Sequence, residues 1–339
     1  MNETSLLNEY QKLCPGITKV FVVPQIPQKN RDTSYLFQLY KNFPEDFPVS
    51  GIKVETFNAA FLPVILFSRL KFEKSILHYH WFEFEDVKSL IGIKWKFFWI
   101  ILYKILGGKV IWTVHNKYPH HNKYLFLNKK FRKFFARIAD KLHVHCKSAV
   151  DICAEVLGVK ESKFFVLKHP DFTPEIIERD EALEKLNKKY FNDLLRNDDR
   201  IFVMFGAIAE YKGIKEVINI FTGLDRRNKL LIAGFIKRRN EDYYRELQTI
   251  SKTENVFLIG KMIPDDDVPY FLNSADCIIL NYRDVLTSGG IHLALGYKKP
   301  VITPYSGCLK ELHSNQINFF ELNSERNKNL LNVIKKFAL

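Results

Sequence analysis

The sequence predicts an α/β protein in which two Rossmann-like domains face a cleft. Three observations lead to this prediction. The chain has 339 residues, more than one ordinary core holds, so two domains of roughly 100–200 residues are expected. Short β-rich runs alternate with helical stretches in both halves, as in parallel sheets whose strands are joined by helices. Runs such as VIWTV at 110–114 are almost wholly apolar, which indicates strands buried on both faces.

The first domain is placed at residues 1–172. Its strands are expected at 19–23, 52–57, 75–80, 109–115 and 141–145. Its helices are expected at 32–43, 93–106, 124–140 and 148–157. The helical stretches carry apolar residues at a period near 3.6, whereas the strand candidates are short and rich in β-branched and aromatic residues.

The second domain is placed at residues 173–325. Its strands are expected at 200–205, 229–233, 255–259, 276–280 and 300–303. Its helices are expected at 213–224, 240–252, 268–274 and 288–296. The charged stretch 174–199 lacks strand character and is interpreted as a helical connection between the domains. Residues 326–339 are expected to form a C-terminal helix, for which a return to the first domain is considered.

Composition excludes several classes of protein. The N-terminus has no apolar core of a secretory signal, and the longest strongly apolar run, 97–103, is far shorter than the ~20 residues of a membrane-spanning helix. No C-x-x-C spacing supports a zinc site, and no histidine pair has metalloprotease spacing, so no metal or other cofactor is predicted. A cytoplasmic location is expected. The cysteines are scattered and odd in number: Cys14, Cys146, Cys153, Cys277 and Cys308.

Positive charge is concentrated in one segment. Residues 91–139 contain eleven Lys or Arg and no Asp or Glu, with aromatic residues interleaved. Such a segment can bind an anionic membrane surface, and nucleic acid would also attract it. The third interpretation is a solvated basic face over a buried aromatic face. Peripheral contact with the cytoplasmic face of a membrane is therefore left open, and nucleic acid is not favoured as a partner.

Two loops of the second half have features of an anion site. Open α/β sheets bind ligands beyond the carboxyl ends of their strands. The strand at 200–205 is followed by Gly206, Lys212 and Gly213, which combine a tight turn, a cation and the start of a helix. The strand ending at 280 is followed by Thr287, Ser288, Gly289 and Gly290. Two hydroxyls and two unobstructed amides at a helix start exceed what an N-cap needs, which favours phosphate binding.

The order of these motifs resembles the donor half of GT-B glycosyltransferases, in particular family 4 and related enzymes of bacterial polysaccharide biosynthesis. The likeness runs from 205 to 307 through "LIAG", "FLIGKMIPDDDVPYFLNSADCIILNYRDVLTSGG" and "LALGYKKPVITPYSG". It implies that Gly206, Lys212, Gly213 and Thr287–Gly290 hold the diphosphate of a nucleotide-sugar. The resemblance also implies that the nucleoside is bound by Gly260, Lys261, Met262, Tyr282 and Asp284.

The sequence departs from that family at three positions. Family 4 enzymes usually have an arginine shortly before the lysine, where this turn has Ala207 and Ala209. They also carry two glutamates eight residues apart, where this chain has Val285 and Leu293. Asp284 could replace only the first glutamate, with a shift of one position.

The first half has two histidine-rich motifs, HYHW at 78–81 and TVHN at 113–116, each after a strand. Histidines at strand ends can donate to sugar hydroxyls or merely bond backbone groups. The motifs resemble the acceptor half of the same enzymes. This resemblance implies that His115 lies against the transferred sugar and that the cleft is lined by Arg31, Tyr35, His80, Glu83 and Asn116.

The expected function is transfer of a hexose-type sugar from a nucleoside diphosphate to a hydroxyl of a glycan or lipid-linked acceptor. For an inverting reaction, Asp32 or Glu83 would be the base, and for a retaining reaction His115 would position the sugar. Two alternatives remain: a sugar-nucleotide epimerase of the same architecture, and a non-catalytic nucleotide- or nucleic-acid-binding protein.

Overall fold

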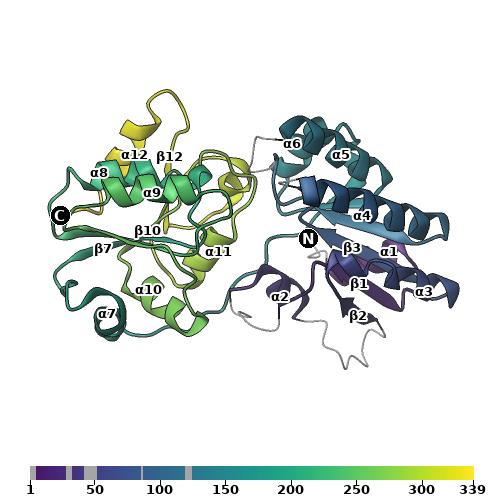
Figure 1. Ribbon diagram of the computed structural model, residues 1–339, viewed down its shortest axis with the longest axis horizontal. Coiled ribbons are helices and arrows are strands. Elements are labelled where there is room, and N and C mark those ends of the chain that lie inside the picture. The colour runs from purple at the N-terminus through teal and green to yellow at the C-terminus, as the bar shows by residue number, and fades with distance from the viewer. Residues whose placement is uncertain (1–4, 28–32, 42–51, 85–86, 119–123) are drawn as a thin grey trace. The chain divides into compact units, whose positions relative to one another are not determined.

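The computed structural model describes residues 5–27, 33–41, 52–84, 87–118 and 124–339. The chain divides into two compact units, Met1–Pro170 and Asp171–Leu339, which are coloured purple to teal and green to yellow in Figure 1. Within the described residues, each unit is built on a six-stranded sheet in which all paired strands are parallel. The predicted α/β fold class is confirmed.

The first sheet has the strand order β2-β1-β3-β4-β5-β6. Its strands are β1 (Lys19–Val23), β2 (Lys53–Thr56), β3 (Ser75–His80), β4 (Lys109–Thr113), β5 (Lys141–Val144) and β6 (Phe164–Val166). Its helices are α1 (Leu6–Leu13), α2 (Tyr35–Tyr40), α3 (Val64–Leu70), α4 (Val87–Ile105), α5 (Leu125–Ile138) and α6 (Ser148–Leu157). Sequence analysis missed α1, α3 and β6, which are all short.

The alternation of β3 determines where its histidines lie. Ile76, His78 and His80 are all buried, and the core on the Ile76 face is completed by Tyr10 of α1 and Tyr40 of α2. Tyr79 points to the other face, where its ring meets Phe135 of α5. Because successive side chains of a strand point to opposite faces, both histidines face α1 and α2.

The second sheet has the order β12-β11-β10-β7-β8-β9. Its strands are β7 (Arg200–Phe205), β8 (Asn228–Ala233), β9 (Val256–Ile259), β10 (Cys277–Ile279), β11 (Val301–Pro304) and β12 (Ile317–Phe320). Its α-helices are α7 (Arg179–Leu186), α8 (Ile214–Phe221), α9 (Glu241–Ile250), α10 (Val268–Ser274), α11 (Gly289–Gly296) and α12 (Arg326–Ile334). The helices α8, α9 and α12 cover one face and α7 and α10 the other (Figure 1).

The stretch 174–199 is more than a connection. It forms α7 and a π-helical turn, Asn187–Phe191, and Leu183, Leu186 and Phe191 are buried in the core of the second unit. Its charged residues had hidden this apolar stripe.

The C-terminal helix α12 packs in the second unit. Leu330 and Ile334 are buried there beside residues of β7, β8 and α8, and the division of the chain assigns this segment to that unit. The apolar spacing of 330, 333 and 334 gives α12 one face to bury, and the second sheet covers that face.

Candidate functional site

The diphosphate residues predicted after β7 do lie together in the second unit. The neighbouring strands β7 and β10 end beside each other, and a small pocket at these ends is lined by Gly206, Lys212, Asn281 and Tyr282 among others. Gly206 has a positive φ of 93°, a conformation that glycine adopts without a steric penalty. Sequence analysis found Gly206, Lys212 and Tyr282, and it missed Asn281.

A close backbone approach shapes this turn. Gly234, after β8, has a φ of 155°, and a Cβ on it would lie 2.0 Å from the carbonyl oxygen of Gly206. The amide of Gly206 in turn donates to the carbonyl of Ala233 at 2.9 Å. Any larger residue at 234 would displace the turn that carries Lys212.

Lys212 directs its ammonium into the turn. Its Nζ donates to the carbonyl of Phe205 at 2.9 Å, and a Cβ on Gly206 would lie 3.2 Å from the same nitrogen. Desolvation lowers the pKa of Lys212 to about 8, because burial disfavours the charged form of an amine. A diphosphate at this position would supply a counter-charge to this ammonium, whose hydrogen bond to Phe205 is to a neutral carbonyl.

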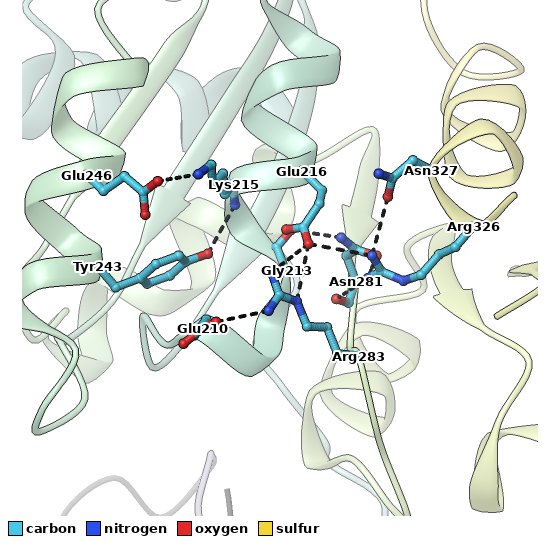
Figure 2. Close-up of polar contacts among 10 residues, drawn as sticks. All are labelled: Glu210, Gly213, Lys215, Glu216, Tyr243, Glu246, Asn281, Arg283, Arg326 and Asn327. Atoms are coloured by element: carbon cyan, nitrogen blue, oxygen red, sulfur yellow. Dashed lines mark hydrogen bonds and ion pairs between the residues drawn. The ribbon is translucent and has the colours of Figure 1, made fainter. Parts of the chain in front are cut away.

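Gly213 is held by Asn281 (Figure 2). It has a φ of 58°, and a Cβ on it would lie 2.6 Å from both the side-chain nitrogen and the carbonyl oxygen of Asn281. The buried Asn281 donates to the Gly213 carbonyl at 2.8 Å and accepts from Arg326 of α12 at 2.6 Å. The start of α8, the end of β10 and the start of α12 are thus joined through one side chain.

An ion-pair cluster stands next to this junction (Figure 2). Arg283 pairs with Glu216 of α8 at 2.7 Å and with Glu210 at 3.0 Å, and its amide donates to the carbonyl of Tyr211 at 2.9 Å. Arg326 approaches Glu216 at 3.7 Å. These contacts hold both flanks of Lys212. The sequence offered no signal for them because the partners are far apart along the chain.

The helix α11 begins at the predicted Thr-Ser-Gly-Gly motif. Ser288 occupies the N-cap position, but its side chain makes no capping hydrogen bond, and its Oγ is 2.7 Å from the hydroxyl oxygen of Tyr282. Gly290 could not gain a side chain freely, because a Cβ would lie 3.1 Å from that same hydroxyl oxygen. The hydroxyl of Ser288 therefore leaves the first amides of α11 available, as an anion site at a helix N-terminus requires.

The predicted nucleoside residues are more dispersed. Gly260, Lys261 and Met262 follow β9, two strands from β7 in the sheet. Lys261 lies over the ring of Tyr190 at 5.0 Å, and Met262 is exposed. Asp284 is also exposed. Tyr282 alone of the five lines the pocket of Lys212.

The two positions where the family has glutamate are occupied by partly buried apolar residues. Val285 and Leu293 both pack against the buried core on the α7 and α10 face of the second sheet. A carboxylate at either position would need a polar partner in that apolar environment. The packing around Val285 and Leu293 therefore suits the apolar side chains that this chain has there.

In the first unit, three predicted residues contact one another. Nδ1 of His80 lies 3.2 Å from Nε2 of His115, and the ring of Tyr35 meets the rings of His115 and His80 edge-on at 4.8 and 5.8 Å. Trp81, which was not among the predicted site residues, stacks on His115 at 4.3 Å and 9°. Its φ of 47° is rare for a bulky residue, so its neighbours hold it in place.

A buried chain of hydrogen bonds continues from His80. Its Nε2 lies 3.1 Å from the Tyr40 hydroxyl, which lies 2.7 Å from Nδ1 of His78. Nε2 of His78 lies 2.7 Å from Oγ1 of Thr113, which lies 3.0 Å from Nδ1 of His143. This chain orients the ring of His80 and, through it, that of His115.

The charge state of these histidines follows from burial. Desolvation, with repulsion from neighbouring imidazoles, holds the pKa of His80 and of His115 well below the usual range. For His143, desolvation lowers the pKa to about 4. Near neutral pH the rings are therefore uncharged, and His115 can act as a hydrogen-bonding group rather than as a cation.

Glu83 and Asn116 also come together. Nδ2 of Asn116 donates to a carboxylate oxygen of Glu83 at 3.1 Å, and the carbonyl of Asn116 accepts from the buried Arg132. Arg31 and Asp32 lie outside the described residues. Among the residues that the structure describes, no three His, Cys, Asp or Glu side chains converge to hold a metal ion.

Comparison with known proteins identifies related folds. Residues 187–338 match the family of group 1 glycosyl transferases. The whole chain is similar in structure to HepE from Anabaena solved with UDP-glucose, with a TM-score of 0.66, 14% identity, and coverage of 94% of this chain and 88% of that one. A glycosyltransferase from Rickettsia africae gives a TM-score of 0.60 and 16% identity, covering 96% of this chain and 95% of its own.

A sucrose-phosphate synthase from Thermosynechococcus elongatus gives a TM-score of 0.64 and 13% identity, with 94% of this chain and 88% of the other covered. At such identities the likeness concerns the fold. None of the curated proteins matches the chain by sequence. The family match and these folds confirm the predicted resemblance to GT-B glycosyltransferases.

Proposed function

We propose that this chain, whose residues 187–338 match the group 1 glycosyl transferases, moves a hexose-type sugar from a nucleoside-diphosphate donor to a hydroxyl of a glycan or lipid-linked acceptor. The observation that carries the proposal is Lys212. Its ammonium lies in a pocket at the carboxyl ends of β7 and β10, where open α/β sheets bind their ligands.

The proposed chemistry at this end is stabilisation of the leaving group. Negative charge grows on the diphosphate as the bond to the sugar breaks, and an oriented cation and amides lower the energy of that state. Lys212 would supply the cation, and Ser288, Gly289 and Gly290 the amides. Because these groups can meet the charge, the proposal includes no metal ion. Gly206, Gly213 and Thr287 would shape the two turns.

The nucleoside would lie toward Gly260, Lys261 and Met262, with Tyr282 and Asp284 at its other side. HepE was solved with UDP-glucose, so uridine nucleotides are the first donors to test. The identity of the nucleotide base and that of the transferred sugar are both proposed here.

On the acceptor side, two courses are proposed. In an inverting reaction, Glu83 or Asp32 takes the proton of the acceptor hydroxyl as it attacks. In a retaining reaction, neutral His115 donates or accepts a hydrogen bond to the transferred sugar and no protein base is named. Tyr35, His80, Asn116 and Arg31 would line the acceptor subsite.

The test is thermal stabilisation by UDP, GDP, CDP and the corresponding nucleotide-sugars. A ligand that binds the native state raises the free energy of unfolding by mass action, by about 2.7 kcal/mol at a hundredfold excess over Kd, and the melting temperature rises with it. Wild type should respond to one base, Lys212→Ala should lose the response, and Lys215→Ala should keep it. Lys215 is a matched control because its ammonium pairs with Glu246 (Figure 2).

Activity then separates the alternatives. A glycosyltransferase releases nucleoside diphosphate in proportion to added acceptor, whereas an epimerase converts the nucleotide-sugar without an acceptor. A non-catalytic protein would bind the nucleotide and leave it unchanged. An equal response of wild type and Lys212→Ala to every nucleotide would contradict the assigned diphosphate site.

A further inference from the structure

The helix α4 carries large apolar side chains on the side that its own unit leaves uncovered. Its buried side is formed by Ile93, Phe97, Ile100 and Tyr103. On the opposite side a second apolar row repeats every three or four residues and is between 36% and 74% exposed: Ile91, Trp95, Phe98, Ile101 and Ile105. A helix that is apolar on both sides has a second surface to bury.

This row continues onto α3. The C-terminal ends of the two helices are joined, since the guanidinium of Arg69 donates to the carbonyl of Leu106 at 3.0 Å, and both helices lie on the first unit in Figure 1. The exposed apolar residues of α3 and its two flanks are Phe61, Val64, Phe67, Leu70 and, at 90% exposure, Phe72. We call these residues and the exposed row of α4 the α3–α4 face. Exposed apolar patches of this extent mark interaction surfaces.

Basic residues predominate around the face. Lys94 lies within the exposed row of α4 and is itself exposed, and Lys71 follows α3. The helix α5 packs beside α4 through Phe97 and Phe134, whose ring centroids are 4.9 Å apart. It exposes Lys130, Lys133 and Arg137. Two acidic residues nearby are already paired with lysines, Asp140 with Lys104 at 2.6 Å and Glu73 with Lys19 at 2.8 Å.

We propose that the α3–α4 face docks on an anionic membrane surface, with α4 lying in the plane of the interface. Apolar side chains enter the boundary between head groups and acyl chains, while lysine and arginine attract anionic lipids. None of the described helices is long and apolar enough to cross a bilayer. A symmetric contact with a second copy would place basic residues of like charge against one another, so the charge favours lipid over self-association.

The test is co-sedimentation of the full chain with vesicles of phosphatidylcholine and phosphatidylglycerol, compared with vesicles of phosphatidylcholine alone. Wild type should bind the anionic vesicles, and added salt should weaken the binding. The variant Phe98→Glu/Ile105→Glu should bind at least about tenfold more weakly, because it places charge in the apolar row. The matched control Ile176→Glu/Leu194→Glu changes two exposed apolar residues of the second unit and should bind as wild type does.

A second variant tests the electrostatic part. Lys130→Ala/Lys133→Ala/Arg137→Ala should reduce binding to the anionic vesicles by up to about a hundredfold, at roughly 1 kcal/mol for each lost charge. Equal sedimentation of wild type and Phe98→Glu/Ile105→Glu would overturn the proposal. A second result would also overturn it: wild type fails to bind vesicles and has the mass of a dimer in light scattering, while Phe98→Glu/Ile105→Glu has the mass of a monomer. A second copy of the chain would then cover the face.

Thermal stabilisation by nucleotides is measured on the same variants. The nucleotide response should be unchanged in all of them, because the α3–α4 face belongs to the first unit and Lys212 to the second. The membrane proposal and the donor-site proposal are therefore tested separately. If one of them is refuted, the other is still decided by its own measurement.

Discussion

Raising the pH should weaken nucleotide binding through Lys212. Burial lowers the pKa of this lysine to about 8 in the free protein, so about half of the molecules carry the ammonium at that pH and about a tenth do one unit higher. A bound diphosphate favours the charged form and raises the pKa again. Binding above this pKa therefore requires proton uptake, and the affinity should fall by up to about tenfold for each pH unit above about 8.

The assay is titration calorimetry with UDP, or with whichever nucleotide stabilises the protein, from about pH 7 to about pH 9.5, in buffers of different ionisation enthalpy. The slope of log Kd against pH and the buffer dependence each report the protons taken up. The Lys212→Met variant should bind weakly at every pH and show a much smaller slope. A wild-type affinity that stays constant across this range, or an equal slope in both proteins, would refute the reasoning.

Three further perturbations have expected outcomes. As the pH falls from about 6.5 toward about 4, the first unit should lose stability, on the order of 3 kcal/mol for His143 alone, because the folded state binds fewer protons than the unfolded state. Gly213→Ala should cost about 1–3 kcal/mol of unfolding free energy, because its Cβ would lie 2.6 Å from Asn281. Tyr282→Phe should cost about 1 kcal/mol by losing its contact with Ser288.

Each of these has a measurement and a control. Denaturant unfolding followed by near-ultraviolet circular dichroism at several pH values tests the histidines, and a flat profile between these limits would count against them. For Gly213→Ala the control is Gly158→Ala, which has a similar φ of 65° but nothing within 4 Å of the added Cβ. Equal costs for the two would show that backbone strain alone accounts for the effect. An unchanged midpoint for Tyr282→Phe would remove the role assigned to its hydroxyl.

The fold was predictable because its signals are local and repeated. The apolar runs at 110–114 and 201–205 became central strands, and the turns after them carry the predicted Gly206, Lys212 and His115. Because ligands bind at the carboxyl ends of parallel strands, the loops that follow these strands were the predicted site. Short elements escaped prediction, since a helix such as α3 is too brief for its period to stand out.

The contacts that hold the candidate site were less predictable. Asn281 and Arg326 are ordinary residues in the sequence, and only the fold brings them to Gly213. The stacking of Trp81 on His115 depends on a backbone conformation that aromatic residues rarely adopt. The hydroxyl of Ser288 illustrates a different limit, because the sequence assigned it to a phosphate site and gave no sign of its contact with the Tyr282 hydroxyl.

The link from Arg326 through Asn281 to Gly213 has a consequence for how the second unit assembles. It joins the earliest helix after β7 to the last helix of the unit, so its contacts are among the most distant along that part of the chain. Such contacts can form only once the loops between the segments have closed. We therefore expect the turn that carries Lys212 to reach its final geometry only when α12 has docked. Nucleotide binding by a folding chain should accordingly be all-or-none, and it reports completion of the whole unit rather than formation of one loop.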